Sequence, residues 1–152
     1  RIARPYRFVL VGNRKWWTPS MQHTLDAMKF KHEVIFAGRV SDEDLNDLMG
    51  AAVANVYVST FEGFGIPIIE AFQSGVPVIT SNVTSMPEIA DNAAMLVNPL
   101  DSNALSNAIL QLATSEVLRQ ELILKGKQRA SEFTWQRSAD LLWESILKTT
   151  ES

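Results

Sequence analysis

Residues 59–71 constrain the fold of this chain more than any other stretch of its sequence. A run of β-forming apolar residues at 53–58 leads into the stretch, and an apolar segment that starts at Pro67 leads out of it. Gly63 and Gly65 lie between them, so the pattern predicts a strand, a glycine-rich turn and then a helix. A turn of this kind leaves backbone N–H groups available to an anion at the positive end of the helix dipole.

Two carboxylates, eight residues apart, accompany this turn. Glu62 lies on the turn, and Glu70 lies about one turn into the helix. We expect the amides of Phe64, Gly65 and Ile66 to lack backbone partners there, because the first N–H groups of a helix have none. Glu70 has apolar neighbours in the sequence, where burial of an unpartnered carboxylate is costly. A pair of ribose hydroxyls would satisfy it, and so would a backbone group or a nearby arginine.

Composition excludes several classes of function. The 152 residues are enough for one domain with a hydrophobic core, and the net charge of −3 argues against a broad nucleic-acid footprint. The chain has no cysteine, which excludes disulfides and thiolate chemistry, and its two histidines, nine residues apart, fit no common metal-ligand spacing. Because the sequence starts at Arg1, we expect a piece of a longer protein.

Short apolar segments alternate with helical patterns over the first two thirds of the chain. We predict strands at 6–11, 33–37, 54–58, 76–80 and 95–97. Helices are predicted from Thr18 to about 30, from Ser41 to about 50, from Pro67 to 74 and at 86–90. Three helices follow, one capped by Asp101, one at 116–132 and one from Trp135 to 147.

This alternation predicts an α/β fold, a Rossmann-like parallel sheet flanked by helices on both faces, followed by a helical C-terminal segment. Ligands of such sheets bind at the carboxyl ends of the strands. The loops at 12–17, 38–41, 59–66 and 80–87 all follow strands, so we expect them at one edge. The turn and both carboxylates belong to that edge.

The full string of motifs resembles the C-terminal domain of the GT-B glycosyltransferases, in particular the retaining family 4 group. That family carries a Glu, seven residues, Glu motif, which here runs from Glu62 to Glu70. The resemblance extends over nearly the whole chain, through the segments 36–45, 71–80, 85–89, 96–99 and 133–135.

The resemblance implies a role for each matched residue. Glu62 would be the catalytic residue, facing the donor sugar near the reacting carbon, and Glu70 would hold the ribose hydroxyls. The remaining donor-binding residues would be Arg39 and Val40 at the base and Gly63, Phe64, Gly65 and Ile66 at the sugar and phosphates. For Arg39 a plain surface position is equally open, and for Lys15 a solvated loop position is favoured over a phosphate contact.

The resemblance also implies the reaction of the intact protein. It would transfer a glycosyl group from a nucleotide-diphosphate sugar to a sugar or lipid-linked glycan acceptor, with retention of configuration and without a metal or other cofactor. We expect residues 1–152 to form a single donor-binding domain that lacks the family's first strand and its N-terminal acceptor domain, and is inactive alone. The expected location is the cytoplasm, with peripheral membrane association of the full-length protein left open.

Two other functions remain as alternatives. A nucleotide-sugar 2-epimerase has the same fold and binds a similar ligand, although the Glu62–Glu70 spacing favours the transferase. A non-catalytic α/β binding module is the second alternative. The apolar stripe of the last helix, which includes Trp135 and Trp143, predicts core packing. In the family that helix often crosses to the other domain, in which case these tryptophans would be exposed here.

Overall fold

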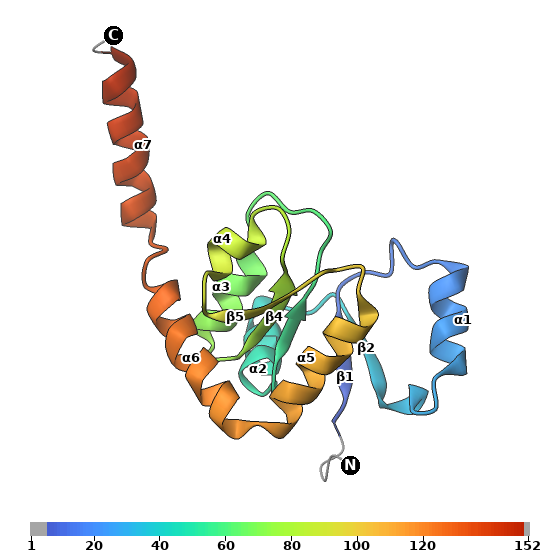
Figure 1. The fold of residues 1–152 in the computed structure, drawn as a ribbon. Helices are drawn as coiled ribbons and strands as arrows, with labels where there is room; N and C mark the ends of the chain where they lie inside the picture. The colour runs from blue at the N-terminus through green and yellow to red at the C-terminus, as the bar shows by residue number, and fades with distance from the viewer. Residues whose placement is uncertain (1–5, 151–152) are drawn as a thin grey trace. The chain divides into compact units, whose positions relative to one another are not determined.

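The computed structural model describes residues 6–150, which form seven α-helices and five strands (Figure 1). The strands are β1 (Phe8–Val11), β2 (Val34–Gly38), β3 (Asn55–Tyr57), β4 (Val78–Ser81) and β5 (Ala94–Val97). The helices are α1 (Pro19–Ala27), α2 (Asp42–Gly50), α3 (Ile66–Gln73), α4 (Met86–Ala90), α5 (Ser102–Thr114), α6 (Glu116–Ala130) and α7 (Trp135–Thr150), with a 3₁₀ turn at Lys31–Glu33. The predicted alternation of strands and helices is therefore confirmed.

All strand pairs within residues 6–150 are parallel, as predicted, but they belong to two sheets instead of one. β1 pairs with β2, and β4 lies between β3 and β5. The chain divides into two compact units at the same place, Arg1–Leu48 and Met49–Ser152. We call them the N-terminal and C-terminal units and describe each by itself. The single domain over 1–152 stays a prediction.

Helix boundaries in and beside the N-terminal unit follow local capping. The Thr18 hydroxyl accepts a hydrogen bond from the Met21 N–H at 3.2 Å, which starts α1 where predicted. Ser41 caps α2 in the same way, accepting from the Asp44 N–H at 3.1 Å. The predicted end of α1 near residue 30 is wrong, because Met28 adopts an extended backbone and the helix stops at Ala27.

The C-terminal unit is built around β4, all of whose residues are buried. Alternate side chains of a strand point to opposite faces, so Val78 and Ile79 belong to two separate core clusters. Val78 packs with apolar residues of α3 and α4, and Ile79 packs with those of α5 and α6. Helices therefore cover both faces of this sheet, as predicted (Figure 1).

The last helix, α7, has no buried residue, and all of its side chains are exposed. Trp135 is 93% exposed and Trp143 is 61% exposed. Core packing of the apolar stripe was therefore a wrong prediction, and exposure of these tryptophans is confirmed. Within residues 6–150, no helix is both long enough and apolar enough to cross a membrane.

Helix α6 approaches α3 closely at Gly126. A Cβ added at Gly126 would lie 2.7 Å from Cδ1 of Phe72, whose side chain is only 1% exposed. An alanine gains about 1 kcal/mol of helix propensity over glycine. Overpacking of a closed core costs about 1–3 kcal/mol, so the steric term should dominate here.

We therefore predict that Gly126→Ala lowers the free energy of unfolding by about 1–2 kcal/mol, as measured by urea denaturation. Gly50→Ala is the matched control, because Gly50 is a helical, exposed glycine with open space around its Cβ position. The control should be neutral or slightly stabilising. A Gly126→Ala variant as stable as Gly50→Ala would contradict the close packing of α6 on α3.

Candidate active site

The predicted strand, turn and helix are present as β3, residues 58–65 and α3. The helix begins at Ile66, one residue before the predicted start, so Pro67 occupies its second position. Gly65 is the N-cap residue, with a positive φ of 109° that few side chains tolerate. The first helical hydrogen bond runs from the Ile68 N–H to the Gly65 carbonyl at 2.9 Å. The turn therefore lies at the carboxyl end of β3, as predicted.

Hydroxyls at the end of β4 hold the end of β3 and the start of the turn. The Thr80 hydroxyl donates to the Tyr57 carbonyl at 2.8 Å, and the Ser81 hydroxyl donates to the Ser59 carbonyl. Both donors are completely buried. Buried hydroxyls need hydrogen-bond partners, so these two bonds fix the point at which the chain leaves the sheet.

The loop that follows β4 holds the centre of the turn. The Glu62 N–H donates to the Thr84 hydroxyl at 3.3 Å. The Ser85 hydroxyl lies 3.0 Å from the Glu62 carbonyl and 2.9 Å from the Phe64 carbonyl, both of which accept from it. Side chains therefore supply the hydrogen bonds that a regular turn would make within itself. Residues 80–87 were predicted at this edge, but their role in holding the turn has no signal in the sequence.

Four backbone amides at the end of the turn and the start of α3 have no hydrogen-bond partner within residues 6–150. Among the residues that the structure describes, the N–H groups of Gly63, Phe64, Gly65 and Ile66 donate no hydrogen bond. They lie at or just before the N-terminus of α3, where the helix dipole places partial positive charge. Four unpaired donors beside a helix N-terminus can bind an anionic oxygen.

Glu70 is half-buried on α3, next to buried Ile69 and Ala71. Its carboxylate accepts no hydrogen bond and forms no ion pair within the described part of the C-terminal unit, which argues against pairing with a nearby backbone group there. A half-buried carboxylate without a partner is costly. The residue is thus available to accept hydrogen bonds from a ligand.

Glu62 is half-buried on the turn, and its Oε1 accepts a hydrogen bond from the Tyr57 hydroxyl at 2.6 Å. Burial is the main cause that raises the pKa of Tyr57 from 10.0 to about 12, followed by the hydrogen bond to Glu62 and the negative charges of Glu62 and Glu70. The negative charges of both carboxylates of the motif therefore act on the Tyr57 hydroxyl. Tyr57 was not predicted as a site residue, because in the sequence it is only part of an apolar strand.

The other predicted base-binding and phosphate-binding residues belong to the N-terminal unit. Arg39 is exposed and Val40 is half-buried, directly after β2. Lys15 is exposed, with its Nζ 5.6 Å from the ring centre of Trp16, which fits the favoured solvated position. The structure describes the two units separately, so contacts of Arg39, Val40 and Lys15 with a donor stay predictions.

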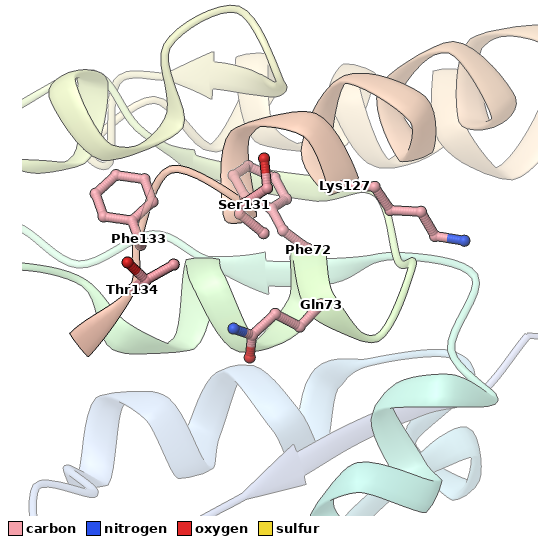
Figure 2. A pocket seen from close by; sticks show the side chains of 7 residues that line it. Phe72, Gln73, Lys127, Ser131, Phe133 and Thr134 are labelled. Carbon is pink, nitrogen blue, oxygen red and sulfur yellow. The ribbon is translucent and has the colours of Figure 1, made fainter. Parts of the chain in front are cut away.

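A pocket of about 370 Å³ lies elsewhere in the C-terminal unit (Figure 2). Its lining residues come from the end of α3, the end of α6 and the segment before α7, and are Phe72, Gln73, Lys127, Ala130, Ser131, Phe133 and Thr134. It contains no carboxylate and none of the predicted donor residues. The candidate site is the turn at the sheet edge, and none of its residues lines this pocket.

The chain belongs to the group 1 glycosyltransferase family, whose model, described as "Glycosyl transferases group 1", matches residues 1–115. It is 37% identical over 131 residues to the O-antigen chain mannosyltransferase B of Escherichia coli, covering 86% of this chain and 34% of that protein. It is 38% identical over 104 residues to the O-antigen chain mannosyltransferase RfbU of Salmonella typhimurium, covering 68% of this chain and 30% of that protein. The chain thus spans about a third of the length of these relatives.

The fold is shared with a solved structure of Anabaena Alr3699/HepE in complex with UDP and glucose. The TM-score is 0.77 at 20% identity, covering 94% of this chain and 40% of that chain. The resemblance to GT-B glycosyltransferases predicted from the motifs is therefore confirmed at the level of family and fold.

The first prediction from the site concerns the charge beside Tyr57. Glu62→Gln should lower the pKa of Tyr57 below 12 but leave it above 10.0, because burial, the largest cause of the increase, remains. An ultraviolet titration of tyrosinate in a Tyr6→Phe background would measure this, since Tyr6 and Tyr57 are the two tyrosines of the chain. An unchanged titration in the Gln variant would contradict the contact.

A raised pKa in the folded state also makes stability depend on pH. The unfolded tyrosine ionises near pH 10.0 and the folded one near pH 12. The ionisation of Tyr57 should therefore cause no pH dependence of stability below pH 10. Stability should then fall as the pH rises from 10 toward 12. Tyr57→Phe should reduce that alkaline fall, as measured by denaturant unfolding at several pH values.

The second prediction concerns the backbone of the turn. Gly65→Ala should destabilise the protein by about 1–3 kcal/mol, because a non-glycine residue is strained at positive φ. Its Cβ would also lie 3.1 Å from Cδ1 of Ile68. Gly63→Ala is the matched control, with nothing within 4 Å of the added Cβ, and should change stability by less than about 0.5 kcal/mol. Equal thermal midpoints for the two variants would contradict the turn geometry.

Proposed function

We propose that this chain is the donor-binding part of a retaining glycosyltransferase that uses a nucleotide-diphosphate sugar. The observation that carries the proposal is that a half-buried carboxylate, Glu70, lies on the same helix as four amides at its start, and that none of these groups has a hydrogen-bond partner within residues 6–150. A carboxylate accepts hydrogen bonds from hydroxyls, whereas amides at a helix N-terminus bind anionic oxygens. A nucleotide sugar offers both kinds of group in one molecule.

Each residue of the candidate site contacts a different part of the donor. Glu70 accepts hydrogen bonds from the ribose hydroxyls, and the amides of residues 63–66 contact the phosphates and the sugar hydroxyls. Glu62 faces the sugar near the reacting carbon, where a fixed negative charge stabilises positive charge that develops as the glycosidic bond breaks. Arg39 and Val40 contact the base. The amides and the helix dipole offset phosphate charge without a metal ion.

The relatives support a role in glycan biosynthesis. Two of them are named as O-antigen chain mannosyltransferases, so a mannosyl donor is the first to test. The structural neighbour was solved with UDP and glucose, which makes a uridine donor the second. The acceptor, a sugar or a lipid-linked glycan, is bound by parts of the full-length protein outside this chain, and the reaction occurs in the cytoplasm. Family membership favours this reaction over the 2-epimerase alternative.

The proposed roles predict different kinetic defects in the full-length protein. Glu62→Gln should lower kcat by at least about 100-fold with little change in the donor KM, because its interaction strengthens in the transition state. Glu70→Ala should raise the donor KM by about 10-fold to 100-fold, because it removes hydrogen bonds to a charged group. Proton NMR of the product should show the donor's anomeric configuration retained.

Glu43→Gln is a suitable control, because this exposed carboxylate lies on α2 and outside the proposed site. It should leave both constants unchanged. Equal effects of the two site variants on kcat and on KM would contradict the division of labour, and an inverted product would contradict the retaining mechanism.

A further inference from the structure

We propose that Tyr57 is a positioning residue for Glu62, holding one carboxylate oxygen so that the other faces the donor sugar. This inference rests on the proposed function, because it assigns Tyr57 a role through the catalytic carboxylate. The observation that carries it is the 2.6 Å hydrogen bond from the Tyr57 hydroxyl to Oε1 of Glu62. That bond leaves Oε2 of Glu62 without a protein partner within the described residues.

The Tyr57 side chain is held on a rigid part of the sheet. Tyr57 is the last residue of β3 and pairs in register with Thr80 of β4. Its carbonyl accepts from the buried Thr80 hydroxyl at 2.8 Å, and its ring packs against the core cluster that contains α3. The phenol therefore projects from a fixed backbone, whereas Glu62 lies on a turn.

Glu62 needs such support because its turn forms no regular structure. Its N–H is held by Thr84 and its carbonyl by Ser85, both from the loop after β4. These bonds fix the backbone of Glu62 but leave three side-chain torsions free. The hydrogen bond from Tyr57 removes that freedom before the donor binds, which is how a supporting residue preorganises a site.

Tyr57 remains a hydrogen-bond donor throughout the pH range of an enzyme assay. Burial and the two nearby carboxylates raise its pKa to about 12, so the phenol is neutral at neutral pH. It therefore neither accepts a proton nor competes with Glu62 for positive charge on the sugar. Its only polar contribution to Glu62 is the oriented O–H group.

The alternative is that Tyr57 serves packing alone. Its ring contributes to the core, and a phenylalanine would preserve that contribution while it removes the hydroxyl. A packing role predicts no change in turnover for Tyr57→Phe. A positioning role predicts a loss of kcat at unchanged donor KM, because the donor still binds through Glu70 and the amides of the turn.

The test uses the full-length enzyme with wild type, Tyr57→Phe, Glu62→Gln, the double variant and Tyr6→Phe as a control in the N-terminal unit. We expect Tyr57→Phe to lower kcat by about tenfold, the effect of one lost hydrogen bond to a charged group, with the donor KM unchanged. The double variant should be no slower than Glu62→Gln alone, because Tyr57 acts only through Glu62. Tyr6→Phe should match wild type.

Three results would overturn the inference while the proposed function stands. They are an unchanged kcat in Tyr57→Phe, a parallel change of kcat and KM with a lowered melting temperature, or a double variant whose losses multiply. A normal kcat in Glu62→Gln would instead overturn the proposed role of Glu62, and with it the role of Tyr57. The comparison of the two single variants thus separates the two failures.

Discussion

The site depends on β4, the buried central strand of the C-terminal unit. Helices cover both of its faces, and its last two residues, Thr80 and Ser81, turn their hydroxyls to the carbonyls at the end of β3. Buried hydroxyls require partners, so the position of the turn follows from the packing of the core. The side chains of Thr84 and Ser85 hold the backbone of Glu62, and the amides of residues 63–66 donate no hydrogen bond to any group within residues 6–150.

In that arrangement, hydrogen-bond donors and hydrogen-bond acceptors come from different groups of the turn and the helix. In the proposed function, the backbone at 63–66 donates hydrogen bonds to anionic oxygens, Glu70 accepts hydrogen bonds from hydroxyls, and Glu62 faces the reacting carbon of the sugar. Opposite charges so close together would pair if the donors were flexible cations. Backbone amides fixed at a helix N-terminus cannot swing toward the carboxylates, so both remain available to a ligand.

Local signals in the sequence predicted most of this fold. The capping residues Thr18 and Ser41 started their helices where expected, and the positive φ of Gly65 agrees with the glycine-rich turn. Features that depend on contacts between distant parts of the chain were harder to predict. The stripe of α7 shows which face is apolar but not whether anything covers it, and strand pairing into two sheets has no local signal. The Tyr57–Glu62 contact was missed because a strand tyrosine gives no hint of its partner.

Donor binding at the turn can be tested directly by NMR, by mapping the backbone amide chemical shifts of this chain with and without nucleoside-diphosphate sugars. We expect the amide signals of residues 63–66 to move on addition of the matching donor, because these N–H groups, which have no partner within residues 6–150, acquire acceptors. Shifts confined to the pocket lined by Phe72, Lys127 and Phe133, with the amides of the turn unmoved, would contradict it.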